Sequence, residues 1–249
     1  MLLKVAINGA RAPEEHPALP IRPAEQAVSA AAALRAGAGA VHLHVRGPDG
    51  RESLAGADVD VTLAAVRATC GAAPVGVSTG AWIVPDPADR LAAVEGWRNR
   101  PDFASVNFHE PGAVEIARAL LRRSIGVEAG LTSGEAARVL VASGLGASCV
   151  RVLLEPQEAE PAAALRTVEL IEAVLADGLV DAPRLLHGTG PTAWPLLAAA
   201  RRRGYDGRIG LEDTLLLPDG RRARDNAELV TAALDHLRGA AALAGASAR

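Results

Sequence analysis

The chain has 249 residues, which fits one large domain or two small ones. Hydrophobic residues make up 49%, charged residues 22%, and the formal net charge is −3, so we expect a globular protein without the basic surface that nucleic-acid binding needs. The longest apolar stretches, 30–34 and 240–243, are too short to span a bilayer, and the N-terminus is typical of a strand, not of a signal peptide. Cys70 and Cys149 lie far apart in apolar surroundings, which favours two free thiols and a cytoplasmic location.

Strand-like and helix-like stretches alternate along the whole chain. We predict strands at 5–8, 40–46, 74–78, 103–107, 125–128, 149–153, 184–187 and 208–211. The predicted helices are 24–36, 58–69, 86–97, 113–123, 133–143, 159–176, 192–203 and 226–237. Strands alternating with helices indicate a parallel sheet, and eight such units predict that the sheet closes. The predicted fold is therefore an α/β protein, a (β/α)8 TIM barrel that forms a single domain over residues 1–249, with a doubly wound open sheet as the alternative.

Two histidines in the second predicted strand are the first candidates for chemistry. His42 and His44 are two residues apart, so in a strand their side chains point to the same face. Neutral imidazole is a common metal ligand, and two on one face make half a site. A Gly-Pro-Asp-Gly turn at 47–50 ends the strand just after them, which places them at the carboxyl end, where barrels keep their sites. The alternative is a pair of hydrogen-bonded core histidines.

Polar residues also collect at the carboxyl ends of the other predicted strands, which in a barrel face one mouth. They are Asn8, Arg11, Arg46, Ser78, Thr79, Ser105, Asn107, His109, Glu110, Glu128, Arg151, Glu155, His187, Thr189, Arg208, Glu212 and Asp213. Glu212 follows the eighth strand, which lies close to the second in a closed barrel, and it is the best third ligand for the histidines. Two histidines and a carboxylate suit a catalytic Zn²⁺ or a similar divalent ion. The alternative is that Glu212 caps its loop against Arg208 or Arg46.

Several short motifs, taken together and in order, resemble one known family. They are HLHVR at 42–46, VSTG at 77–80, GLED at 210–213 and NAELV at 226–230, with NGAR at 8–11 and HPALP at 16–20 near the start. The set is similar to the β-keto acid cleavage enzyme family, whose namesake is 3-keto-5-aminohexanoate cleavage enzyme. The resemblance implies a Zn²⁺-dependent barrel enzyme that reacts a β-keto acid with acetyl-CoA to give acetoacetate and the CoA ester of the rest of the substrate. It also implies a homo-oligomer.

The resemblance assigns roles to particular residues. By it, His42, His44 and Glu212 fall on the zinc ligands of the family. Arg208 and Asp213 fall on its catalytic arginine and aspartate. This agrees with the chemistry, because negative charge that builds on an enolate needs nearby positive charge, and removal of an α-proton needs a base.

Further residues are expected to hold the substrate or to complete the site. Ser78 and Ser105 fall where the family binds its substrate, and Glu128 matches a further active-site glutamate. We expect Ser78, with the backbone amides of Thr79 and Gly80, to bind the substrate carboxylate. Asn107, at the end of the same strand as Ser105, is also assigned to the substrate site.

Arg11 departs from the namesake, which carries an acidic residue there that meets an amino group of the substrate. An arginine disfavours a cationic substrate tail and favours an anionic or polar one. The alternative is a structural Arg11 that pairs with Glu14 or Glu15.

Two other functions fit the same residues. One is a metal-dependent keto-acid aldolase or lyase that works on the same barrel without CoA. The other is a non-catalytic barrel that binds a metal and a keto acid. Against the second, Arg208 and Asp213 accompany the ligands, and binding alone does not require them.

Overall fold

The computed structural model describes residues 1–246, with side chains described through residue 238. The strands are β1 (Leu3–Ala6), β2 (Ala40–Leu43), β3 (Val75–Ser78), β4 (Phe103–Asn107), β5 (Gly126–Leu131), β6 (Arg151–Leu154), β7 (Arg184–Leu186) and β8 (Asp206–Ile209). The helices are α1 (Pro23–Arg35), α2 (Gly56–Cys70), α3 (Pro87–Glu95), α4 (Ala113–Arg122), α5 (Gly134–Ser143), α6 (Pro161–Asp177), α7 (Ala193–Arg203) and α8 (Asn226–Ala246). Short 3-10 turns lie at Pro13–Glu15, Gly146–Ser148 and Gly190–Thr192. Among the helices described, none is both long and apolar enough to cross a bilayer.

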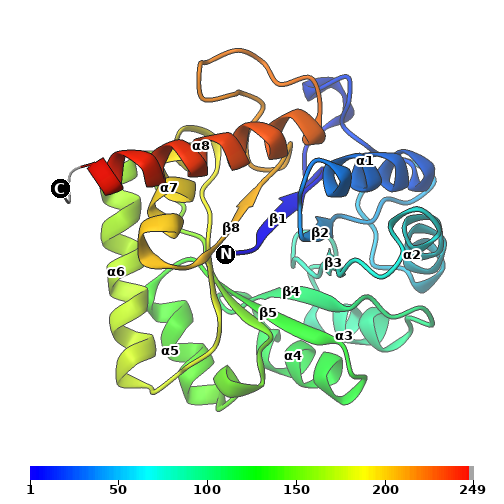
Figure 1. The fold of residues 1–249 in the computed structure, drawn as a ribbon. Helices are drawn as coiled ribbons and strands as arrows, with labels where there is room; N and C mark the ends of the chain where they lie inside the picture. Colours follow the sequence, from blue (N-terminus) through cyan, green and yellow to red (C-terminus); the bar gives the residue numbers. More distant parts are fainter. Residues whose placement is uncertain (247–249) are drawn as a thin grey trace.

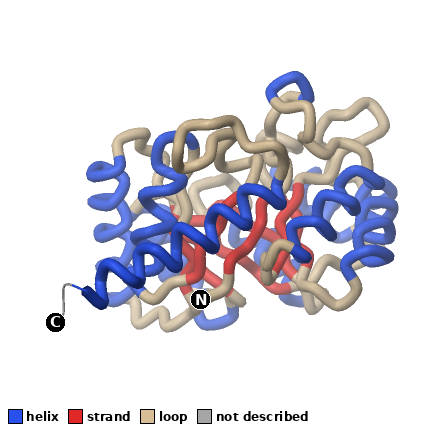
Figure 2. The backbone as a smooth tube through the Cα atoms, turned by 45° about the horizontal axis from the view of Figure 1, so that its top comes forward, coloured by secondary structure: helices blue, strands red, loops and turns tan. Residues whose placement is uncertain are grey.

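The eight strands form a closed parallel barrel. Each strand pairs with the next in the chain, and β1 also pairs with β8, with Lys4 opposite Arg208. The predicted (β/α)8 barrel is therefore confirmed, and the open sheet is excluded. Figure 1 shows the helices around the strands, with α8 packed between α7 and α1 to complete the ring. In Figure 2 the strands lie in the middle and helices flank them.

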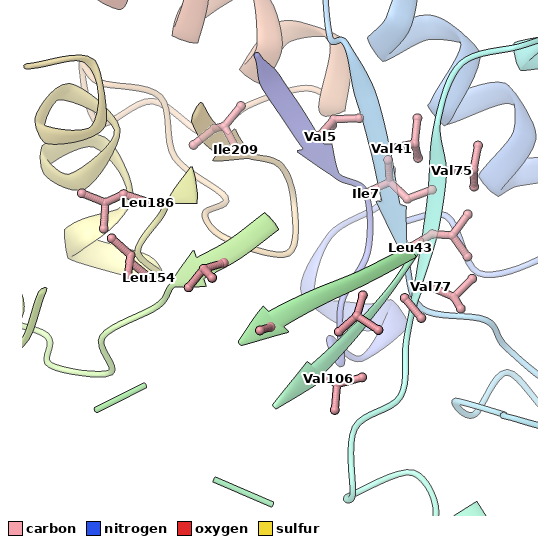
Figure 3. Packing of buried hydrophobic residues seen from close by; sticks show 14 of the residues in the cluster. Val5, Ile7, Val41, Leu43, Val75, Val77, Val106, Leu154, Leu186 and Ile209 are labelled. Carbon is pink, nitrogen blue, oxygen red and sulfur yellow. The ribbon is translucent and has the colours of Figure 1, made fainter. Parts of the chain in front are cut away.

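Side chains along the strands alternate between two environments. On β2, Val41 and Leu43 belong to the hydrophobic core, whereas His42 between them lines a cavity inside the barrel. Figure 3 shows apolar side chains of this core along neighbouring strands. Cys149 lies in the same core, Cys70 packs against it, and both are free thiols, as predicted. Because the helices cover the outside of the sheet, the apolar core lies between strands and helices, and polar side chains can occupy the barrel interior.

An ion network of four residues links β1, β5, β6 and β8. The ammonium of Lys4 contacts the carboxylate of Glu128, and both side chains are fully buried. Arg151 donates to the other oxygen of Glu128 at 2.7 Å and pairs with Asp206 at 3.2 Å. Since an uncompensated buried charge is strongly destabilising, each of these charges depends on its partners.

Four strand boundaries differ from the prediction in ways that matter for the site. β2 ends at Leu43, not at 46, so His44 and Arg46 follow the strand. β5 runs to Leu131, not to Glu128, because its pairing with β4 and β6 continues through Gly130 and beyond. Glu128 therefore lies in the middle of a strand, in the ion network, and not at the mouth. β1 and β8 each begin and end two residues earlier than predicted, which leaves Asn8 and Glu212 in the loops that follow. The last helix continues to Ala246, beyond the predicted end at 237.

Candidate active site

A cavity of about 650 Å³ lies at the carboxyl ends of the strands, and every strand or the loop after it contributes to its lining. Of the residues predicted for the site, those that line the cavity are Arg11, His42, His44, Ser78, Ser105, Asn107, Arg208 and Glu212. Those outside the lining are Thr79, Gly80, Glu128 and Asp213. Lining residues that the sequence prediction left without a role include Trp82, His109, Glu155 and His187.

Three potential metal ligands converge on one side of this cavity. The Nε2 atoms of His42 and His44 lie 3.7 and 3.6 Å from Oε2 of Glu212, and the three residues offer ligand atoms within 4.8 Å of one another. Two ligand atoms that are each about 2.1 Å from one ion, at the tetrahedral angle, lie about 3.4 Å apart, so the observed spacing fits a shared cation. Oε2 of Glu212 is buried and has no hydrogen-bond partner in the described part of the chain. The donor set and this partnerless oxygen both fit a divalent metal.

The charge states of the ligands also suit a metal. Burial lowers the pKa of His42 well below its ordinary value, so its imidazole is neutral and has a lone pair to donate. Burial alone would raise the pKa of Glu212, but Arg208 and the two histidines outweigh it and lower that pKa. Arg208 lies 3.0 Å from Oε1 of Glu212, which leaves Oε2 for another partner.

Glu52, which the sequence prediction missed, orients His44. Its Oε1 lies 2.5 Å from Nδ1 of His44, which directs Nε2 toward Glu212. A carboxylate on the far nitrogen of a ligating histidine is a common feature of metal sites, where it fixes the ring and raises its basicity. The indole of Trp82 also donates to Glu52 and stacks on His44. The Gly-Pro-Asp-Gly turn at 47–50 could have pointed to Glu52, because such a turn folds the chain back on itself. In the structure Arg46 forms an antiparallel bridge with Glu52, which brings Glu52 beside the histidines.

Gly9 allows Glu212 to reach the histidines. Gly9 has a φ of +60°, and a Cβ built on it would lie 2.4 Å from Cγ of Glu212. Arg46 holds this loop from the other side by donating to the carbonyl oxygens of Gly9 and Arg11. Any side chain at position 9 would therefore push Glu212 away from its place.

We expect Gly9→Ala to weaken metal binding by about 10–100-fold, the range seen when the support of a metal ligand is disturbed. The matched control is Gly71→Ala, because Gly71 has a φ of +58° with nothing within 4 Å of its Cβ position. Both variants place an alanine at a positive φ, but only the first puts a Cβ against Glu212. The measurement is competition against a chelator of known affinity, and equal affinities in the two variants would contradict this account of Gly9.

Arg208 and Asp213 form a buried pair beside the candidate ligands. Arg208 comes from β8 and donates to Oδ1 of Asp213 from Nε at 3.1 Å and from a terminal nitrogen at 2.5 Å. Oδ2 of Asp213 is buried and, within residues 1–246, has no hydrogen-bond partner. Burial raises the pKa of Asp213 to about 6, although Arg208 opposes the shift. Asp213 thus lies behind Arg208, which itself lines the cavity.

The hydroxyls of Ser78 and Ser105 occupy the neighbouring wall, at β3 and β4. Thr79 and Gly80, which are expected to contact substrate, lie beside these serines and contact them. The backbone nitrogen of Gly80 donates to Oγ of Ser78 at 3.3 Å, and the hydroxyl of Thr79 donates to the carbonyl oxygen of Ser105 at 2.7 Å. In this arrangement Thr79 and Gly80 position the two serines.

Arg11 lies at the rim of the cavity, half-buried and in an ion pair. It contacts Glu15 at 2.7 Å and donates to the carbonyl oxygen of Leu211 at 2.5 Å. Glu15 offsets the charge of the guanidinium, so the pairing with Glu15 that the sequence left open as an alternative is the arrangement observed.

The fold and this geometry define a (β/α)8 barrel with a His-His-Glu candidate metal centre at its mouth. The chain belongs to the beta-keto acid cleavage enzyme family, whose family model matches residues 1–125 and 157–245. The resemblance inferred from the motifs is thereby confirmed. The unmatched internal stretch, residues 126–156, includes β5, α5 and β6.

Solved structures of ObcA share the fold of this chain. The apo structure is 20% identical with a TM-score of 0.70, and the match covers 90% of this chain and 62% of ObcA. The binary complex of ObcA with oxaloacetate is 19% identical, with a TM-score of 0.69 and coverage of 90% and 64%. The ternary complex of ObcA with a C4-CoA adduct and oxalate is 20% identical, with a TM-score of 0.57 and the same coverage. This chain therefore spans less than two thirds of the length of ObcA, and at these identities the likeness shows the fold alone.

Proposed function

We propose that this protein is a metal-dependent β-keto acid cleavage enzyme that condenses a β-keto acid with acetyl-CoA and releases acetoacetate and a new acyl-CoA. The observation that carries the proposal is the convergence of His42, His44 and Glu212 at the barrel mouth, in a chain of this family. One solved complex of ObcA contains oxaloacetate, which is a β-keto acid, and another contains a C4-CoA adduct and oxalate. They support a keto acid and a CoA thioester as the two substrates.

His42, His44 and Glu212 would hold the metal, which we propose to be Zn²⁺. A bound divalent cation supplies Lewis acidity, which lowers the energy of negative charge developing on a carbonyl oxygen. Two imidazoles and one carboxylate leave room for further ligands, as catalytic sites require. Glu52 keeps His44 in the orientation that this role needs.

Arg208 and Asp213 are assigned to the proton transfer that starts the reaction. Arg208 remains protonated and stabilises the negative charge of the enolate. Asp213 takes the α-proton on Oδ2, since Oδ1 is held by Arg208. The raised pKa of its carboxyl, about 6, is closer to neutral pH than that of an ordinary aspartate, which favours a general base. Because Asp213 lies outside the cavity lining, this role requires Arg208 to shift when substrate binds.

Ser78 and Ser105 are assigned to the substrate carboxylate, with Thr79 and Gly80 positioning them. A carboxylate bound at these hydroxyls lies along the wall next to β2 and the histidines, because β3 pairs with β2. The keto group of the same molecule then faces the candidate metal centre.

The test is a screen of β-keto acids, oxaloacetate included, with protein of measured metal content and with or without acetyl-CoA. The proposal predicts acetoacetate and an acyl-CoA in equal amounts, and only when acetyl-CoA is present. Cleavage without acetyl-CoA would instead identify the aldolase or lyase. Metal-loaded protein that binds β-keto acids but converts none would identify the binding barrel.

Three finer properties stay predictions from the sequence. Metal analysis of protein purified without added metal tests for zinc. Light scattering in solution tests for a homo-oligomer, and cell fractionation tests for the cytoplasmic location.

A further inference from the structure

The cavity lining at the carboxyl ends of β4, β6 and β7 carries side chains to which the proposed reaction assigns no role. The Nδ1 atom of one of them, His187, lies 3.7 Å from Oδ1 of Asp213. Of the candidate ligands, His42 lies in β2, His44 follows it and Glu212 lies in the loop after β8. The lining residues Asn107, Glu155 and His187 lie at the end of β4 and directly after β6 and β7. The unmatched residues 126–156 include β5 and end just after Glu155. This wall is therefore partly built by the stretch that the family model does not describe.

Glu155 is a carboxyl on this wall with one oxygen engaged and one without a partner. Its Oε2 lies 3.2 Å from Nε2 of His187, while its buried Oε1 has no hydrogen-bond partner in the described structure. Burial raises the pKa of Glu155 to about 7, so its negative charge is poorly compensated when no ligand is present. A buried acceptor without a donor is costly, and a donor from a ligand would remove that cost.

A second acceptor oxygen lies beside Oε1. An ideal Cβ on Gly130 would lie 2.2 Å from Oε1 of Glu155 and 2.7 Å from Oδ1 of Asn107, so the two oxygens are neighbours above the backbone of Gly130. Asn107 keeps its oxygen on this side because its Nδ2 donates to Glu110 at 2.8 Å. The absence of a side chain at position 130 thus leaves room for both oxygens beside this strand, and both residues line the cavity. Such a site calls for a hydrogen-bond donor.

We propose that Glu155 and Asn107 form the subsite for the distal end of the β-keto acid, and that they select a tail carrying a hydrogen-bond donor, either a hydroxyl or a protonated amine. The inference rests on the proposed function, because it takes the substrate carboxylate to lie at Ser78 and Ser105 and the keto group to face the candidate metal centre. A carboxylate tail would meet two acceptors and be rejected. Arg11 does not favour such a tail either, because Glu15 already offsets its charge.

The test compares 3-oxohexanoate with its C5-hydroxyl and C5-amino derivatives and with 3-oxoadipate, by calorimetric binding to the metal-loaded protein and by kcat/KM. For the wild-type protein we expect affinity for the hydroxyl or amino compound to exceed that for 3-oxohexanoate by about tenfold or more. Glu155→Met should bring that ratio close to one. Glu155→Gln should retain preference for the hydroxyl but lose it for the amine, because the charge is gone. Glu172→Gln, which alters a half-buried carboxylate that contacts Tyr205 outside the cavity lining, should leave the ratios as in the wild type.

Because the readout is a ratio between similar substrates, a general loss of folding or activity cancels. Equal affinities in the wild type, preference for 3-oxoadipate, or a ratio unchanged by Glu155→Met would overturn the inference. If Glu155→Met does not fold, Glu155→Gln decides. The inference is overturned if this variant binds the amino and hydroxyl compounds with the same ratio of affinities as the wild type. If the protein binds the donor-bearing compounds selectively but converts none, the subsite stands and the proposed reaction is wrong. If it converts β-keto acids without selecting a donor-bearing tail, the reaction stands and the subsite is wrong.

Discussion

Replacing Asp213 by asparagine is expected to lower kcat by about 10²–10⁴-fold while the metal stays bound. An amide cannot accept the α-proton, yet it is the same size as the carboxyl and can still contact Arg208. Glu212 and the two histidines are unchanged, so metal content should match that of the wild type. The measurements are steady-state turnover with the best β-keto acid and metal analysis of the same preparation.

The matched control for Asp213→Asn is Asp206→Asn. Asp206 also pairs with an arginine, at the other end of β8, but it lies outside the cavity lining. We expect the control to change stability and to keep most of the turnover. Near-normal turnover of Asp213→Asn would remove Asp213 as the base, and an equal loss in both variants would point to a structural effect.

Replacing His42 by alanine is expected to lower metal affinity by more than about 100-fold, beyond the effect of disturbing a supporting residue, and to abolish turnover. The imidazole of His42 is one of only three side chains that converge on the site in the described structure, so its loss leaves a histidine and a carboxylate. Glu212→Gln should have a similar effect, because a neutral amide replaces the anionic ligand. Affinity is measured by chelator competition, and turnover is measured with excess metal.

The control for these ligand variants is His236→Ala. His236 packs against Trp194 and does not line the cavity with the candidate ligands. It should bind metal as the wild type does. Unchanged metal binding in both His42→Ala and Glu212→Gln would mean that the ion is held elsewhere.

The fold could be predicted because its signal is local. Each strand and helix has its own periodicity, and eight repeats of the pair leave few ways to arrange a parallel sheet. The prediction was least accurate at strand ends, since the pairing of neighbouring strands decides where a strand stops. Glu128 shows this: β5 extends to Leu131 because β4 and β6 both pair with it there, and Glu128 lies with Lys4 instead of at the mouth.

The candidate site could be predicted only in part. The convergence of His42, His44 and Glu212 follows from barrel closure, which brings β8 to β1 and β1 to β2. The environment of each side chain does not follow from its position in the sequence. That Asp213 lies behind Arg208, and that Glu155 meets His187, depends on contacts between distant segments that no single stretch encodes.

The central claim is that one divalent ion is held by His42, His44 and Glu212. The most direct measurement is a crystal structure of the zinc-loaded protein, with the ion located by its anomalous scattering. We predict a single strong peak about 2.0–2.2 Å from Nε2 of both histidines and from a carboxylate oxygen of Glu212. A bound zinc ion located elsewhere, or coordinated without Glu212, would contradict it.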